Sequence, residues 1–237
     1  MAYWYLLICL LFSVNVISKR QPIVKSHITA KTKNQLEYNN LLANHDIKIV
    51  IGTGPAGSGK TLLACNEAIK QLKSSDIAKI VITRPVISVD DEQIGFLPGS
   101  MNQKMDPWTR PIFDIFHEFF SKQQVKTMME NDVIEIVPLA YMRGRTFKQS
   151  FIIADEMQNS SPNQMLMLLT RIGEESKLAI TGDLQQTDRS GINGLDDFLE
   201  KIKKSDSVAK YVAYIEMGSD DIQRSEVLKE IIELYKT

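Results

Sequence analysis

Residues 54–61 constrain the fold of this chain more than any other segment. They read Gly-Pro-Ala-Gly-Ser-Gly-Lys-Thr, a glycine and four spacers followed by Gly-Lys-Thr. An apolar run, Ile47 to Ile51, precedes them, and a helix-forming run, Leu62 to Leu72, follows. This order predicts a strand, a tight loop and a helix. Glycines let the loop N–H groups turn towards an anion, and the helix N-terminus adds its positive dipole end. The segment is therefore predicted to bind phosphate.

Each position of this loop has an expected role. The backbone of residues 54–59 (Gly54, Pro55, Ala56, Gly57, Ser58 and Gly59) would surround phosphate oxygens. Lys60 would reach the β- and γ-phosphates of a nucleotide, and the Thr61 hydroxyl would bind Mg²⁺. These roles predict nucleotide binding, a property that kinases, switches and motors share.

The rest of the chain alternates between strand-like and helix-like segments. This alternation predicts an α/β fold with a mainly parallel central sheet. The expected strands are Ile47–Gly52, Lys79–Thr83, Val133–Val137, Ser150–Ala154, Lys177–Thr181 and Val212–Glu216. The expected helices are Lys60–Lys73, Trp108–Ser121, Pro162–Ile172, Gly194–Lys203 and Gln223–Tyr235. The segment Ser88 to Pro107, with two glycines and two prolines, is predicted to be a long surface excursion.

Two acids follow an apolar run that predicts a buried strand. Phe151 to Ala154 lead directly into Asp155 and Glu156. In open α/β sheets, ligands bind at the carboxyl ends of the strands. Asp155 is predicted to hold Mg²⁺, and Glu156 to act as general base on an attacking water. The alternative is a strand that ends in a solvated acidic turn.

The next apolar strand, Leu178 to Thr181, ends in a polar turn, Gly182 to Asp188. Such a turn beside a hydrolytic site is well placed to sense a γ-phosphate. The alternative is an ordinary connecting turn.

Composition and charge limit which kinds of protein this chain can be. The chain has 237 residues, enough for one sizeable domain, and a net charge of −1, which gives no global electrostatic argument for a nucleic-acid partner. Its two cysteines exclude a disulfide framework, and the three scattered histidines argue against zinc. Cys65 is expected to be a small buried apolar residue.

The N-terminal region differs from the rest. Tyr3 to Ile17 is almost wholly apolar, and the basic residues that follow meet no acid before Glu37. The apolar run is short for a membrane-spanning helix, which needs about 20 residues. Three interpretations stay open, namely a signal-peptide core, an organelle transit segment within residues 1–36, and an extension or misassigned start. Residues 1–30 are therefore assigned to an extension and residues 31–237 to the folded domain, for which no stable membrane span is predicted.

Several motifs together resemble the PhoH-like ATPases, whose core is similar to the motor of superfamily-1 helicases. The resemblance runs from about Thr32 to the C-terminus. The segments that carry it are Gly54–Thr61, Ile82–Pro85, Gly95–Gly99, Asp106–Pro111, Pro138–Thr146, Phe151–Asn159, Thr181–Asp188 and Asp221–Arg224. It implies a three-layer P-loop NTPase fold of the RecA or helicase type, with ATP and Mg²⁺ as cofactors. It also implies a cytoplasmic protein.

The resemblance also implies roles for residues outside the loop. Gln35, with Thr32 and Tyr38, would read adenine, since an amide can pair with both N6 and N7. Gln186 would lie between the nucleotide and substrate sites, and Arg224 would sense the γ-phosphate. Arg84, Arg143 and Arg145 would contact a nucleic-acid backbone or act across a subunit interface, and a structural salt bridge is the alternative for Arg143, Arg145 and Arg224.

The predicted function is Mg²⁺-dependent ATP hydrolysis, coupled to binding, unwinding or remodelling of single-stranded RNA or DNA. A homo-oligomer, such as a hexameric ring, would supply neighbouring motor domains. A nucleotide-gated switch with slow hydrolysis is the main alternative. A small-molecule kinase is disfavoured by the Asp155-Glu156 pair, which suits activation of water.

Overall fold

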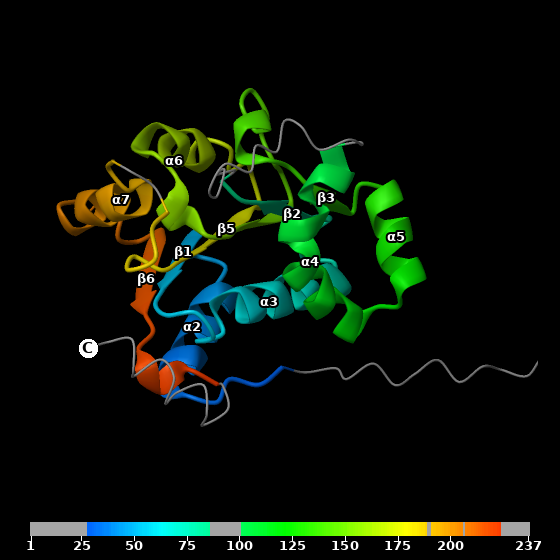
Figure 1. Ribbon diagram of the computed structural model, residues 1–237, viewed down its shortest axis with the longest axis horizontal. Helices are drawn as coiled ribbons and strands as arrows, with labels where there is room; N and C mark the ends of the chain where they lie inside the picture. Colours follow the sequence, from blue (N-terminus) through cyan, green and yellow to red (C-terminus); the bar gives the residue numbers. More distant parts are fainter. Residues whose placement is uncertain (1–27, 86–100, 189–190, 206, 224–237) are drawn as a thin grey trace, which may run out of the picture.

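Six parallel strands form one sheet in the order β3-β2-β4-β5-β1-β6 (Figure 1). The computed structural model describes residues 28–85, 101–188, 191–205 and 207–223, with the backbone alone for residues 101–108. The strands are β1 (Ile49–Thr53), β2 (Lys79–Thr83), β3 (Ile134–Ile136), β4 (Ser150–Ala154), β5 (Lys177–Gly182) and β6 (Val212–Glu216). All five pairings within this sheet are parallel, which confirms the predicted α/β class.

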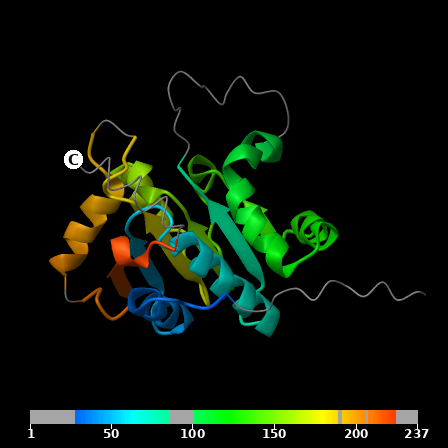
Figure 2. The ribbon, with the colours of Figure 1, turned by 60° about the horizontal axis from the view of Figure 1, so that its bottom comes forward.

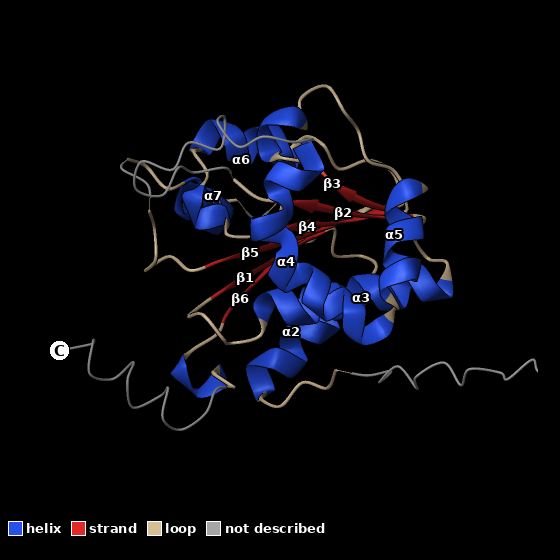
Figure 3. Ribbon diagram, turned by 45° about the vertical axis from the view of Figure 1, so that its right-hand side comes forward, coloured by secondary structure: helices blue, strands red, loops and turns tan. Residues whose placement is uncertain are grey.

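Helices cover both faces of the sheet. They are α2 (Lys33–Ala43), α3 (Lys60–Ser74), α4 (Met101–Phe119), α5 (Lys122–Glu130), α6 (Pro162–Leu169) and α7 (Gly194–Lys203). Short 3₁₀ helices are η2 (Leu139–Tyr141), η3 (Met157–Asn159) and η4 (Ser219–Asp221). Helices α2, α3 and α4 pack on one face, and α6 and α7 pack on the other (Figure 3). The molecule therefore has the three layers that the sequence predicts.

Each face has its own apolar core. Phe151 and Ile153 of β4 point into the core under α3 and α4, whereas Ile152 points into the core under α6 and α7. Strand β4 is buried along its whole length. A strand covered on both faces reads as a continuous apolar run, which is why its bounds were predictable from the sequence.

The predicted strands agree closely with the observed ones. Strands β2, β4 and β6 and helix α7 have the expected bounds. β1 begins two residues later than predicted and ends one later, at Thr53, β3 is one residue shorter at each end, and β5 continues to Gly182. These differences are confined to the strand ends, because where a strand ends depends on its pairing with a neighbouring strand.

Two of the predicted helices need correction. Helix α4 begins at Met101, so residues 101–107 are helical and do not belong to a surface excursion. Met, Gln and Lys before Pro107 favour a helix. Helix α6 ends at Leu169, because the chain turns at Arg171 and Ile172 pairs with Phe147.

Helices α2 and α5 were not predicted. Each begins after a polar N-cap residue, which is a local signal in the sequence. The Thr32 side chain accepts from Gln35 N, and Ser121 forms a capping box with Gln124.

Two other predictions concern residues that lie wholly or largely outside the described part of the chain. Of the expected helix Gln223–Tyr235, only Gln223 is described, and it is not helical. The apolar N-terminal run lies outside them as well. Cys65 is fully buried, as expected. Within the described part of the chain, no helix is both long enough and apolar enough to cross a bilayer.

Candidate functional site

The loop between β1 and α3 has the backbone that its glycines predict. Gly54, Gly57 and Gly59 have φ of +135°, +87° and +92°, values that side chains disfavour. A Cβ at Gly54 would lie 2.2 Å from the Met217 carbonyl oxygen. Only glycine therefore fits there, and the loop can pass close to the end of β6.

Lys60 is folded back over this loop. Its Nζ donates to the carbonyl oxygens of Gly54 (2.6 Å) and Pro55 (2.9 Å) and to Ser58 Oγ (3.2 Å). The side chain is 8% exposed. Its ammonium is thus held at the mouth of the loop by acceptors that phosphate oxygens could replace.

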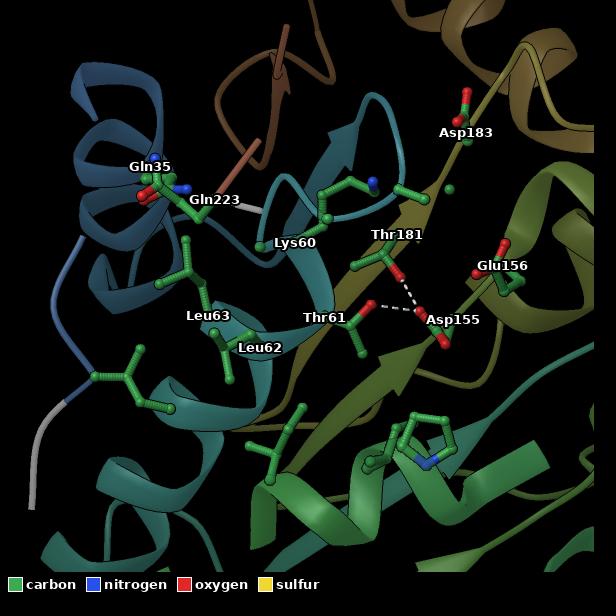
Figure 4. A pocket seen from close by; sticks show the side chains of 18 of the residues that line it. Gln35, Lys60, Thr61, Leu62, Leu63, Asp155, Glu156, Thr181, Asp183 and Gln223 are labelled. Carbon is green, nitrogen blue, oxygen red and sulfur yellow. Dashed lines mark hydrogen bonds between the residues drawn. The ribbon is translucent and has the colours of Figure 1, made fainter. Parts of the chain in front are cut away.

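Two hydroxyls meet one carboxylate oxygen beside the loop. Thr61 Oγ1 donates to Asp155 Oδ1 at 2.7 Å, and Thr181 Oγ1 donates to the same oxygen at 2.5 Å (Figure 4). Thr61 lies in the first turn of α3, Asp155 follows β4 and Thr181 lies in β5. The sheet thus brings together Thr61 and Asp155, the two predicted metal residues. Their oxygen donors suit a hard cation such as Mg²⁺, which also needs water and phosphate oxygens.

Glu156 lies beside this cluster in an unusual backbone conformation, with φ of +54°. A left-handed residue without glycine's freedom is uncommon and is held by its surroundings. Gln158 Nε2 donates to Glu156 Oε2 at 2.6 Å. The carboxylate of the predicted base is therefore held by a residue of η3, the short helix that follows it.

The same Gln158 amide reaches the turn after β5. Its Nε2 also donates to the Gln186 carbonyl oxygen (3.1 Å), and its Oε1 accepts from Asp183 N (3.1 Å). The side chain is 1% exposed. No role for Gln158 was predicted from the sequence. A glutamine two residues after the paired acids was the available signal, but only the fold shows what it contacts.

Gln35 marks the other end of the site. Its Nε2 donates to the carbonyl oxygens of Ser58 (3.0 Å) and Asp221 (3.1 Å), and its Oε1 accepts from Lys31 N (2.8 Å). Both amide protons thus have protein partners. Tyr38, which was grouped with Gln35, is fully buried with its ring against Gly52.

One pocket of about 460 Å³ joins these features, within the usual range for small-molecule sites. Figure 4 shows Gln35 and Gln223 at one end and Asp155 and Glu156 at the other, with Lys60 between them. The polar lining comprises Thr29, Lys31, Gln35, Lys60, Thr61, Arg84, Asp155, Glu156, Thr181, Asp183, Gln186 and Gln223. The apolar lining includes Ile28, Leu62, Leu63, Pro111, Ile112 and Ile115.

The predicted arginines lie in different surroundings. Arg84 lines the pocket. Arg145 forms a double hydrogen bond with Glu135 (2.6 and 2.9 Å) and stacks on Phe147, so it makes the ion pair that was its alternative role. This bond to Arg145 is the main reason that the pKa of Glu135 lies below its usual value. Arg143 is exposed, and Arg224 lies outside the described residues.

Comparison with known proteins points to one family. A protein-family model described as PhoH-like protein matches residues 27–236 of this chain. A PhoH-like protein of Bacillus subtilis is 42% identical over 210 residues, which cover 88% of this chain and 64% of the relative. The PhoH protein of Escherichia coli is 35% identical over 214 residues, covering 89% of this chain and 58% of the relative. The chain thus spans less than two thirds of the length of these relatives.

Solved structures show only distant similarity. The Pif1 helicase from Candida albicans has a TM-score of 0.40 at 14% identity, covering 81% of this chain and 40% of that one. The SWI2/SNF2 ATPase core of Sulfolobus solfataricus in complex with double-stranded DNA has a TM-score of 0.41 at 15% identity, covering 78% of this chain and 43% of that one. Similarity at this level supports no conclusion about what this chain does.

The family match itself extends over nearly the whole chain, and the motifs at residues 54–61, 151–159 and 181–188 all contribute residues to one pocket. This chain therefore belongs to the PhoH family of P-loop nucleotide-binding proteins.

Proposed function

We propose that this protein hydrolyses ATP with Mg²⁺ and couples hydrolysis to single-stranded RNA or DNA. The observation that carries the ATPase proposal is the convergence of Thr61 and Thr181 on Asp155 Oδ1, at 2.7 and 2.5 Å, next to Lys60 and Glu156. The predicted phosphate loop, the predicted metal-binding acid and the candidate base thus line one pocket.

The loop would bind the phosphates. Its N–H groups and the N-terminus of α3 provide positive potential, and the Lys60 ammonium would exchange the Gly54 and Pro55 carbonyls for phosphate oxygens. Thr61 and Asp155 would hold Mg²⁺, which neutralises phosphate charge when bound.

Glu156 is the candidate general base. Its carboxylate would take a proton from the attacking water, while the Gln158 amide keeps that carboxylate oriented. Gln186, which lines the same pocket, would contact the γ-phosphate or the water. Arg224 remains a proposed γ-phosphate contact.

Replacing Lys60 tests the phosphate site. Lys60→Ala should lower ATP turnover by about 10²-fold or more, because it removes the positive charge nearest the phosphates. Lys70→Ala, on the same helix but paired with Glu67, serves as the control and should keep activity within about twofold. Steady-state phosphate release measures the activity of both variants. If Lys60→Ala were as active as Lys70→Ala, the proposed phosphate site would be refuted.

Replacing Glu156 tests the chemistry. Glu156→Gln should keep ATP binding but slow hydrolysis by about 10²- to 10⁴-fold, since the amide cannot accept the proton. Binding by calorimetry and turnover by phosphate release separate the two effects. Normal turnover in this variant would show that Glu156 is not the base.

A nucleotide-gated switch with slow hydrolysis is the second candidate. In that case the 2.6 Å hydrogen bond from Gln158 would hold the Glu156 carboxylate back from the attacking water instead of orienting it towards that water. Nucleic acid separates the two candidates. A coupled motor should hydrolyse ATP faster when single-stranded RNA or DNA is added, whereas an unchanged rate would favour the switch.

The coupling would involve Arg84, which lines the pocket, and the exposed Arg143. A translocating motor normally combines two motor domains. We therefore propose that a homo-oligomer, such as a ring, supplies the neighbouring domain.

A further inference from the structure

Asp221 lies in η4 and has a buried, fully bonded carboxylate. It is 1% exposed. Thr32 Oγ1 donates to its Oδ1, while Asn34 Nδ2 (2.9 Å) and Gly218 N (2.8 Å) donate to its Oδ2. Burial alone would raise the pKa of this carboxyl, but these three donors lower it below its usual value. The negative charge also lies at the positive end of α2.

These bonds tie together segments that are far apart in the sequence. Thr32 and Asn34 belong to the start of α2, and Gly218 follows β6. Figure 2 shows the segment after β6 (red) beside the phosphate-binding loop (cyan) and α2 (blue). The Asp221 backbone carbonyl also accepts from Gln35 Nε2 (3.1 Å), and Gln223 N donates to the Gly57 carbonyl (3.2 Å).

The consequence is a wall at one end of the pocket. Gln35 and Gln223 both line the pocket and lie at the end away from Glu156 (Figure 4). A nucleotide whose phosphates lie on the loop, with its γ-phosphate towards Glu156, must extend its nucleoside towards Gln35 and Gln223.

We propose that Asp221 is a positioning residue for the nucleoside, acting by holding the start of α2 against the segment after β6. This inference rests on the proposed nucleotide site. Asp221 makes no hydrogen bond to Lys60, Thr61, Asp155 or Glu156, so it governs affinity and leaves the chemical step unaffected.

The test compares ATP with inorganic tripolyphosphate, which lacks a nucleoside. Asp221→Asn keeps the shape but replaces one acceptor oxygen by an NH₂ group that faces other donors. The variant should weaken ATP binding by about 10- to 100-fold. Tripolyphosphate binding and kcat at saturating ATP should change by less than about twofold, so the effect appears in KM alone.

Three further variants make the result specific. Asn34→Ala removes one donor, leaves Asp221 in place and should weaken ATP binding several-fold in the same direction. Asp220→Asn, at the exposed neighbouring residue, should behave as the unmodified protein. Lys60→Ala should weaken both ATP and tripolyphosphate. Thermal denaturation without ligand checks that each variant is folded. If Asp221→Asn is unfolded, the binding data for Asn34→Ala decide the question.

The outcomes separate this inference from the proposed function. Equal losses for ATP and tripolyphosphate, a fall in kcat at unchanged KM, or unchanged ATP affinity in both the Asp221 and Asn34 variants would overturn the role of Asp221. Failure of the unmodified protein to bind ATP, or normal binding by Lys60→Ala, would instead overturn the nucleotide site and this inference with it.

Discussion

Gln158 shows how one side chain can connect two parts of a site. Its amide contacts the Glu156 carboxylate, the Gln186 carbonyl and the Asp183 N–H. A Cβ at Gly182 would lie only 2.8 Å from its Oε1, so the turn is packed closely around the amide. Movement of that turn would therefore shift the Gln158 amide and, through it, the Glu156 carboxylate.

We predict that Gln158→Met lowers kcat by about tenfold at unchanged KM for ATP. Methionine fills a similar volume but cannot orient Glu156, and each buried hydrogen bond to a charged group contributes about 1.5–3 kcal/mol. Steady-state kinetics measures the effect. Gln185→Met, at an exposed glutamine in the same turn, is the matched control. A kcat equal to that of the control would contradict the orienting role.

Among the elements, helix α2 is held at both ends by a buried charge. Asp221 lies at its first turn, and Lys177, from the start of β5, lies at its last. Lys177 Nζ donates to the carbonyl oxygens of Leu42 (2.6 Å), Asn44 (2.6 Å) and Leu41 (3.3 Å). A cation at a helix C-terminus satisfies free carbonyls and opposes the dipole. Strand β5, which carries Thr181, is thereby linked to the helix that carries Gln35.

The charge on Lys177 should make stability depend on pH. Burial lowers its pKa to about 8 from an ordinary value of 10.5, with nearby Glu67 opposing this effect and Lys48 adding to it. Between these two pH values the unfolded chain binds more protons at Lys177 than the folded chain does. The contribution of Lys177 to the free energy of unfolding should therefore rise with pH across this window, by at most about 1.4 kcal/mol per pH unit.

Urea denaturation at pH 7.5, 9 and 10 can measure this contribution as the difference between the unmodified protein and Lys177→Met. We expect the variant to be destabilised by about 1–3 kcal/mol at pH 7.5, because carbonyls at the end of α2 lose their donor. The deficit should grow towards pH 10. A deficit that stays constant with pH would show that Lys177 keeps its ordinary pKa. Lys126→Met, at an exposed lysine, provides the control.

At the scale of the whole molecule, the site lies at the carboxyl ends of the parallel strands. The loop after β1, the acids after β4 and the turn after β5 follow neighbouring or next-neighbouring strands in the order β4-β5-β1. The exposed Arg143 lies in the connection that leaves β3, the outer strand of the same sheet. Its neighbour Arg145 is instead fixed to β3 through Glu135.

This contrast predicts different effects for the two arginines. Arg143→Ala should leave the free energy of unfolding within about 0.5 kcal/mol but reduce nucleic-acid-stimulated ATPase activity. Arg145→Ala should instead lower the free energy of unfolding by about 1 kcal/mol, through loss of its pair with Glu135. Denaturation and ATPase assays with single-stranded RNA check both. Full stimulation of Arg143→Ala would exclude a coupling role for that arginine.

The sequence by itself predicted the parts of this protein that local chemistry determines. The glycine pattern requires a loop that only glycines can form, and continuous apolar runs mark strands buried on both faces, so the phosphate loop and most strand bounds could be predicted. The position of the two acids at the end of β4 could be predicted too, because they directly follow one of these apolar runs.

Only the tertiary structure decided which polar groups meet. Thr181, Gln158 and Asp221 are ordinary polar residues in sequence, and their partners lie up to 189 positions away along the chain. The Thr32 N-cap marks the start of helix α2 in the sequence, but its contacts with Asp221 and Lys177 come from distant segments. Hydrogen bonding in a buried site depends on which strands and helices pack together, and that information does not lie in any single stretch of residues.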